Sequence, residues 1–545
     1  MLSFESPAVD WWVLVPQMIL VGVALGLLLV SSLAPRTLPG WVSTVISIAA
    51  GAAAAIVAAV QWAMWGSTPR PTLAGAFVSD GFSLLLTVLI GAGVVMTALV
   101  AHSVLDRYDM APPEFAALLL ASAAGAVVMA GANDLIVLFL GLESLSIALY
   151  VLIALAGRRD SARESAMKYF VLGAFSSAFF LYGIALVYGS TGSTNLSGIG
   201  DFLFGSIRET DYLLLVGIAL LLVGLGFKVA AVPFHFWAPD VYEGAPSPVT
   251  GYLASIAKAA GFAALARVLY VAVAEQSTAW APILIGLAFA TLAVGAVMAI
   301  CQSDVKRMLA YSSISHAGFV LVGLSAVDTG ALRDLWASTG EGAQWIVRVA
   351  GQAPRILTGG TADVASPVSS AVFYLIAYSF MALGSFAVLS VISAERGTLD
   401  PDTSPHALSR YGGLARRRPV LALAFAVLLL AQAGVPLTAG FVAKFEVIRA
   451  AVSTDGYVLA AAAMITAVVG AFAYLRVVLA MYAPEGSDAD GNSAPVALAS
   501  RPRWGGLPLT SVLAISLAVA VTVVVGVFPQ RLLEWSAEAV LSIIL

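Results

Sequence analysis

Long apolar runs recur along the whole chain and are separated by short polar stretches. A run of about 20 apolar residues has the length of an α-helix that crosses the hydrocarbon core of a bilayer. About fourteen such runs can be placed, near residues 10–31, 41–64, 81–102, 112–131, 134–156, 166–189, 211–238, 249–271, 280–301, 307–326, 367–392, 419–448, 457–481 and 508–529. The pattern predicts an all-α, polytopic membrane protein that forms a single integral membrane domain over residues 1–545.

Two of the predicted spans contain a proline well inside the apolar run. Pro233 follows Gly224 and Gly226 in the seventh run, and Pro436 follows Gly434 in the twelfth. A proline removes one backbone donor and clashes with the carbonyl four residues earlier. We therefore expect both helices to be broken, with the freed backbone groups facing protein or water instead of lipid.

The two breaks lie about five helices apart, which predicts two five-helix repeats. The repeats cover approximately residues 112–271 and 280–481. Because each repeat has an odd number of helices, the second copy is expected to be inverted in the membrane relative to the first.

Basic residues in the loops predict an orientation. If the N-terminus is outside, about fifteen Arg and Lys residues fall in cytoplasmic loops and about seven in outer loops, as the positive-inside bias favours. We therefore expect both termini on the outer side. Glu5 and Asp10 precede the first apolar run without a basic segment, so this run is interpreted as a retained span and not as a cleaved signal peptide.

Composition agrees with a membrane protein and excludes several kinds of site. Hydrophobic residues make up 60% of the chain and charged residues 11%, against roughly 25% charged residues in soluble proteins. The net charge of −4 gives no indication of nucleic-acid binding. The single cysteine, Cys301, excludes an internal disulfide and a cluster held by cysteines of this chain alone. No phosphate-binding loop or nucleotide fingerprint occurs in a suitable context, so we expect no redox centre and no cofactor site in this chain.

A few charged residues lie inside the predicted spans instead of in loops. They are Glu143 in the fifth span, Lys228 in the seventh, Lys258 in the eighth and Lys444 in the twelfth. A charge at the bilayer centre costs about 2.5–3.5 kcal/mol on insertion scales, so these groups must be paired or hydrated.

Two interpretations of these charges remain open. A salt bridge between Glu143 and Lys228 could simply pin two helices, and Lys258 and Lys444 could extend toward the membrane surface. The interpretation that we favour is proton transfer. A low-dielectric site disfavours a charged lysine and a nearby carboxylate favours it, so that approach and withdrawal of Glu143 would capture and release a proton at Lys228.

Two histidines add a weaker indication. His235 lies just after the predicted break in the seventh span, and His316 lies in the tenth span. Imidazole titrates in the range that suits proton transfer, although each side chain could also be a hydrogen-bonded structural residue. Without acidic neighbours they do not form a metal site, and we expect none.

The stretch Phe227–Thr250, FKVAAVPFHFWAPDVYEGAPSPVT, resembles the signature of the antiporter-like membrane subunits of respiratory complex I. Within that group it resembles subunit N of bacterial NADH–quinone oxidoreductase. Supporting stretches are Leu140–Ser146, Lys306–Phe319 (KRMLAYSSISHAGF) and Gly434–Phe445 (GVPLTAGFVAKF). The resemblance implies a fourteen-helix fold with two inverted five-helix repeats and a polar axis in the plane of the membrane.

The resemblance also implies roles for individual residues. Glu143 and Lys228 resemble the glutamate–lysine pair of the cytoplasmic-side half-channel, and Lys258 resembles the central lysine. Lys444 resembles the lysine that leads to the outer half-channel, where the subunit M branch has a glutamate. His316 fits the central axis.

The implied function is proton translocation coupled to electron transfer from NADH to quinone. The chain would be a subunit of that enzyme, with FMN, iron–sulfur clusters and quinone in other subunits. Its partners would be the other membrane and peripheral subunits and the lipid of the bacterial inner membrane. The alternatives are a subunit of a multi-subunit cation/proton antiporter and a scaffold whose charges do not conduct. The loops 327–366 and 482–507 are long for this family and are expected to make contacts that the sequence does not identify.

Overall fold

The computed structural model of the protein describes residues 9–33, 39–105, 110–156, 160–205, 211–327, 367–395, 406–483 and 508–539. The two long loops expected at 327–366 and 482–507 lie almost entirely outside these described residues.

Thirteen helices among the described residues are long and apolar enough to cross a membrane. Most are single α-helices: α1 (Trp11–Leu33), α2 (Gly40–Trp65), α3 (Gly81–Ala101), α5 (Pro112–Gly131), α6 (Leu135–Ala154), α7 (Asp160–Thr191), α9 (Tyr212–Val229), α13 (Ser277–Ile300), α14 (Val305–Ser325), α17 (Pro367–Glu395), α21 (Tyr457–Tyr482) and α22 (Leu509–Val527). One span is composite and consists of α11 (Ser247–Tyr252), the π-helix η1 (Leu253–Ala257), α12 (Lys258–Arg267) and the π-helix η2 (Val268–Ala272). The remaining predicted run, 419–448, contains two shorter helices, the apolar helix α19 (Pro419–Ala433) and α20 (Ala439–Ser453). Thirteen of the about fourteen crossings predicted from the apolar runs are therefore confirmed by length and composition.

Shorter elements lie between the spans or after the last one. They are α8 (Leu196–Gly205), α10 (Trp237–Gly244), α18 (Leu414–Arg417), α23 (Gln530–Glu538), and the 3₁₀ turns η3 (Ala274–Gln276) and η4 (Leu408–Tyr411). An antiparallel hairpin of β1 (Arg70–Thr72) and β2 (Phe77–Ser79) pairs Arg70 with Ser79 and lies between α2 and α3.

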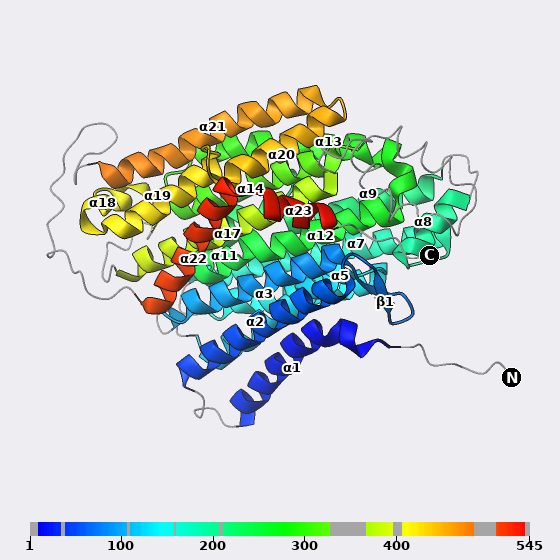
Figure 1. The fold of residues 1–545 in the computed structure, drawn as a ribbon, viewed down its shortest axis with the longest axis horizontal. Helices are drawn as coiled ribbons and strands as arrows, with labels where there is room; N and C mark the ends of the chain where they lie inside the picture. The colour runs from blue at the N-terminus through cyan, green and yellow to red at the C-terminus, as the bar shows by residue number, and fades with distance from the viewer. Residues whose placement is uncertain are drawn as a thin grey trace.

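The long helices lie roughly parallel, with α1 along one edge of the molecule and α21 along the opposite edge (Figure 1). The composite span Ser247–Ala272 and α14 are buried over their entire apolar windows, whereas 28% of the α1 window and 33% of the α21 window are buried. Charged groups on the central spans are therefore surrounded by protein, and the apolar side chains of the rim helices are left for lipid.

Both predicted breaks are present. The helix α9 ends at Val229, Ala230 adopts the left-handed conformation (φ 58°), and α10 begins only at Trp237. The second break separates α19 from α20, with Gly434 at φ 94°. Pro233 and Pro436 lie inside these two gaps, as the sequence predicts. The assignment of residues 112–271 and 280–481 as repeat units stays a prediction.

Candidate functional site

Lys228 lies in the last turn of α9, directly before the first break, and its side chain is buried. Its amine donates hydrogen bonds to Ser146 Oγ of α6 at 2.8 Å and to the Tyr169 hydroxyl of α7 at 3.4 Å. Glu143, one turn before Ser146 on α6, accepts a hydrogen bond from Ser177 of α7. Within these described helices no ion pair joins the Glu143 carboxylate to the Lys228 amine. The predicted pair is therefore brought to neighbouring helices but is open in this conformation.

A small cavity lies beside the Lys228 amine. Its lining includes Lys228, Ser146 and Ser177, and it has space for about one water molecule. Ser177 is the donor to Glu143, so the cavity connects the surroundings of the carboxylate with the amine. A water molecule here would have polar partners on both sides.

Lys258 begins α12 directly after the π-helix η1 and is buried at the centre of the molecule. π-Helical turns inside α-helices frequently occur at functional sites. The amine donates to the backbone oxygen of Ser313 at 2.8 Å and to Ser313 Oγ at 2.5 Å. Ser313 Oγ lies 3.3 Å from the Tyr242 hydroxyl of α10. A hydroxyl both donates and accepts, so Ser313 Oγ can form a hydrogen bond with the Lys258 amine whether that amine is protonated or neutral.

His316 of α14 has a hydroxyl partner on each ring nitrogen. Nδ1 lies 2.6 Å from the Tyr374 hydroxyl of α17, and Nε2 lies 3.0 Å from the Tyr474 hydroxyl of α21. The Tyr474 hydroxyl is in turn hydrogen-bonded to Ser312, the neighbour of the Lys258 partner Ser313. The hydrogen-bond partner of Lys258 and the serine that contacts the Tyr474 partner of His316 are therefore consecutive residues of α14.

Lys444 of α20 is buried, and its amine donates to the backbone oxygens of Gln432 at 2.8 Å and Ala433 at 2.9 Å. These carbonyls belong to the end of α19, where unsatisfied oxygens carry partial negative charge. The amine also lies 5.1 Å from the centre of the Phe319 ring. Lys444 and His316 line a common cavity with space for about one water molecule. The structure thus brings together two of the predicted site residues, Lys444 and His316.

His235 is buried in the first break, between α9 and α10. It lies close enough to Lys258 for their charges to interact. In the described part of the chain its Nδ1 atom has no hydrogen-bond partner. A role for His235 in proton transfer stays a prediction.

One buried ion pair was missed by the sequence reasoning. Arg267 Nη2 lies 2.8 Å from Asp80 Oδ1, both side chains are fully buried, and Arg267 Nε donates to the Ala130 oxygen at 2.5 Å. The two charges are at span ends, where a sequence pattern does not distinguish buried from interfacial groups. Because arginine does not lose its proton in proteins, this pair clamps α3, α5 and α12 and does not carry protons.

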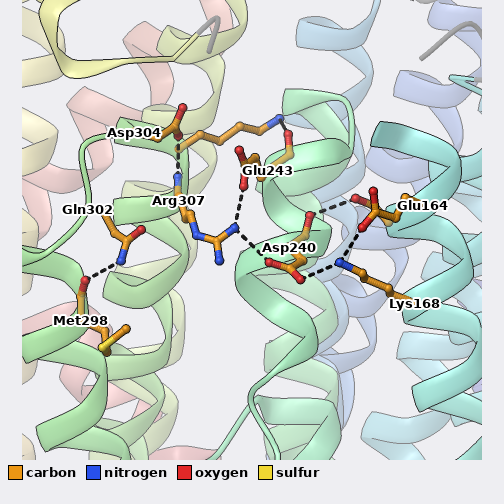
Figure 2. A network of polar contacts seen from close by, with 10 residues as sticks. Glu164, Lys168, Asp240, Glu243, Met298, Gln302, Asp304 and Arg307 are labelled. Carbon is orange, nitrogen blue, oxygen red and sulfur yellow. Dashed lines mark hydrogen bonds and ion pairs between the residues drawn. The ribbon is translucent and has the colours of Figure 1, made fainter. Parts of the chain in front are cut away.

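A second group of charges joins the ends of α7 and α14 through α10 (Figure 2). Asp240 of α10 pairs with Lys168 Nζ and with Arg307 Nη1, each at 2.9 Å. Arg307 also pairs with Glu243 at 2.6 Å, and Lys168 with Glu164 at 2.7 Å. Partial burial acts to raise the pKa of Asp240, but the hydrogen bond from Lys168 and the charge of Arg307 outweigh it, so that the pKa lies below its ordinary value. We call Glu164, Lys168, Asp240, Glu243 and Arg307 the α10 ion network.

Comparison with known proteins identifies the family. The family model described as NADH:quinone oxidoreductase/Mrp antiporter, TM, matches residues 132–336 and 352–470. NADH-quinone oxidoreductase subunit N of Mycobacterium tuberculosis (strain CDC 1551 / Oshkosh) is 36% identical over 578 residues, which cover 99% of each chain. NADH-quinone oxidoreductase subunit N 2 of Roseiflexus castenholzii is 41% identical over 488 residues, covering 89% of this chain and 90% of the relative. The chain belongs to this family, in its subunit N branch.

Solved structures show the same fold. A chain of respiratory complex I from Thermus thermophilus with bound Aureothin is 31% identical, with a TM-score of 0.71 and coverage of 95% of this chain and 98% of that chain. A chain of the Mrp complex from Dietzia sp. has a TM-score of 0.76 with coverage of 97% of both chains, but at 20% identity it shares the fold alone. The predicted membership of the subunit N branch is confirmed by the curated relatives that carry that name.

Proposed function

We propose that this subunit N family member translocates protons across the bacterial cell membrane as part of NADH–quinone oxidoreductase. Membership of the subunit N branch supports the enzyme and its other subunits as the partners. One observation at the site carries the proton-transfer role. Lys228, Lys258 and Lys444 are buried inside spans, and among the residues that the structure describes, every hydrogen bond that their amines donate goes to a hydroxyl or a backbone oxygen. In a purely structural salt bridge the amines would instead contact carboxylates.

The outer half of the proposed proton path is nearly continuous. Hydrogen bonds join Lys258 to Ser313 at one end, and Ser312 to Tyr474 and then His316 at the other. Transfer between the hydroxyls of the neighbouring residues Ser313 and Ser312 requires rotation of a side chain or entry of water. The cavity shared by His316 and Lys444 then supplies room for a water molecule that completes the transfer to Lys444.

The inner half of the path has a gap. Protons enter near Glu143 and reach Lys228 through the cavity beside Ser177. The aliphatic part of the Lys228 side chain packs on Gly261, which lies one turn after Lys258 in α12. A Cβ added at Gly261 would lie 3.1 Å from Lys228 Cγ. Transfer between the two amines therefore requires movement of a side chain or entry of water.

The magnitudes are adequate for such a step. Moving one charge against a membrane potential of 100 mV costs about 2.3 kcal/mol. One pKa unit corresponds to about 1.4 kcal/mol, so a change of about two units in the proton affinity of one lysine covers this cost. We infer that the energy arrives from the other subunits as an electrostatic or conformational change.

The redox groups are assigned to other subunits. Cys301 is the single cysteine of the chain, so that iron–sulfur clusters held by thiolates need further chains. FMN and quinone are likewise placed outside this chain. The excess of basic residues in alternate loops supports an orientation with both termini on the outer side.

Native electrophoresis tests the proposed function. The membrane is solubilised in mild detergent, and the gel is stained for NADH dehydrogenase activity. We expect the chain to migrate with that activity in a large assembly. Migration with a few small membrane proteins, together with sodium-dependent proton flux, would instead assign the chain to a cation/proton antiporter.

A further inference from the structure

The helix α10 lies between the α10 ion network and the first buried lysine. It has eight residues and follows the first break directly. Asp240 and Glu243 lie in the part of α10 that faces Lys168 and Arg307 (Figure 2). Trp237, its first residue, is buried at 2% exposure. The same short helix therefore has one end in the ion network and the other in the interior.

Trp237 touches two groups that define the position of the Lys228 amine. Its indole Nε1 donates to the backbone oxygen of Phe227 at 2.9 Å, one residue before Lys228. Its ring stacks on the Tyr169 ring with centroids 4.6 Å apart and an interplanar angle of 20°. Tyr169 is itself a hydrogen-bond partner of the Lys228 amine. A displacement of Trp237 would move both the backbone and the hydroxyl at this site.

The ion network fixes α10 against two spans at once. Lys168 belongs to α7 and Arg307 to α14, and the Asp240 carboxylate bridges them. The backbone oxygen of Asp240 also accepts a hydrogen bond from Ser165 of α7 at 2.9 Å. The three charged side chains are 31–42% exposed, and ion pairs at such exposed sites contribute little to stability. Their main effect is therefore on the position of α10 and not on the stability of the whole chain.

We propose that Asp240 is a positioning residue for proton transfer at Lys228, because it holds α10 between α7 and α14 and so keeps Trp237 against Phe227 and Tyr169. This inference rests on the proposed function, since it concerns the proton step at Lys228. A shift of α14 relative to α7 changes the bridge at Asp240 and reaches the buried amine through one indole ring.

Charged groups face Asp240 and the rest of α10 from the described elements packed against it. They are Glu164 and Lys168 on α7, Glu243 on α10 itself, and Lys306 and Arg307 on α14. Because the pKa of Asp240 lies below its ordinary value, the carboxylate stays ionised at neutral pH and the network is intact there. A change in the pH profile of pumping near neutrality would therefore not come from titration of Asp240 itself. The titratable groups that face the Lys228 amine are Glu143, Tyr150 and Tyr169.

The test measures NADH-driven proton uptake against pH in sealed inverted vesicles that contain the whole complex. Asp240→Asn keeps the shape of the side chain and removes its charge. We expect it to lower the proton flux through this chain by about two- to thirtyfold and to displace the pH profile. Asp240→Glu should restore most of the flux. The matched control is Glu534→Gln, which removes an exposed carboxylate that pairs with Arg531 on α23, outside the α10 ion network, and it should behave as wild type. Wild-type flux and an unchanged profile in Asp240→Asn, per assembled complex, would overturn the proposal.

A double-mutant cycle tests the route through the indole. Trp237→Phe keeps an aromatic ring and removes the N–H donor to Phe227. We expect the double variant Asp240→Asn/Trp237→Phe to be no worse than the more affected single variant, because both changes release the same contact. Fully additive effects would overturn the route. If Asp240→Asn does not assemble, the proposal is tested with Trp237→Phe alone. An unchanged proton flux and an unchanged pH profile in that variant would refute the proposal.

Lys228→Ala in the same vesicles separates this inference from the proposed function. If Lys228→Ala abolishes flux while the Asp240 variant is normal, only the positioning role is wrong. If Lys228→Ala also pumps normally, the proposed proton site itself is wrong.

Discussion

The two broken helices hold their lysines in different ways. Lys228 precedes its break and donates to side-chain hydroxyls of Ser146 and Tyr169, which belong to other helices. Lys444 follows its break and donates to backbone oxygens of its own span, at the end of α19. A movement of α6 or α7 therefore changes the distance from Lys228 to its hydroxyl partners. The carbonyls that bind Lys444 belong to its own span and depend less on the positions of other helices.

The titratable groups near the two lysines also differ. The carboxylate of Glu143 lies near Lys228 but is bonded to Ser177 in this conformation. Lys444 instead shares its cavity with the imidazole of His316. We infer that the first break is the switchable proton site, whose affinity depends on helix positions, and that the second is a relay of nearly fixed affinity.

The largest expected effect is that of Lys228→Ala. It removes the amine at the switchable break and leaves no other lysine there. We expect the proton flux through this chain to fall by about a hundredfold, the lower end of what a positioned proton-transfer group contributes. Proton uptake by sealed vesicles, with the amount of assembled complex measured on native gels, checks this. Unchanged flux at normal assembly would show that the first break is not a proton site.

The second prediction compares two substitutions at Lys444. Lys444→Ala removes the titratable group and leaves the Gln432 and Ala433 oxygens without their donor. Lys444→Glu keeps a titratable group, which in its protonated form can donate one hydrogen bond to these oxygens. A hydrogen bond contributes about 1 kcal/mol, so we expect the glutamate variant to retain about fivefold more flux than the alanine variant. Equal and total loss in both would argue that the fixed positive charge is what the second break requires.

A smaller effect is expected from the backbone at the two breaks. Gly434→Ala would place a Cβ at a φ of 94°, 3.1 Å from Lys444 Cδ. A side chain in the left-handed conformation costs about 1–2 kcal/mol, so this variant should lower thermal stability and displace the lysine. The matched change Ala230→Gly, at a φ of 58° in the first break, removes such a cost and should stabilise the protein or leave it unchanged. Thermal unfolding of the purified complex is measured for both variants. Equal destabilisation by Gly434→Ala and Ala230→Gly would contradict the claim that both breaks contain a left-handed residue.

The crossings and both breaks could be predicted from the sequence because lipid imposes them locally. A span needs a certain length of apolar residues, and Pro233 and Pro436 disrupt a helix wherever they occur in its interior. The resemblance of the stretch around the first break also predicted the subunit N branch, which the relatives over the whole chain confirm. These features depend on neighbouring residues and not on tertiary packing.

The hydrogen-bond partners of the lysines could not be predicted in the same way. Ser313 and Ser146 come from other helices, and serine is common in spans, so nothing in the pattern distinguishes them. The pair Asp80 and Arg267 was missed because charges at span ends usually face water. The role of α10 also depends on packing, since Asp240 meets Lys168 and Arg307 only after the bundle has formed.

The dependence of Lys228 on Glu143 is the central claim, and a pH profile of Glu143→Gln tests it most directly. Proton pumping by vesicles with equal amounts of assembled complex is measured from acid to alkaline pH and compared with wild type. A nearby carboxylate favours the charged form of an amine. The account therefore predicts that, without the carboxylate, pumping declines at a lower pH on the alkaline side. A profile that coincides with wild type at every pH would contradict the claim that Glu143 controls the proton at Lys228.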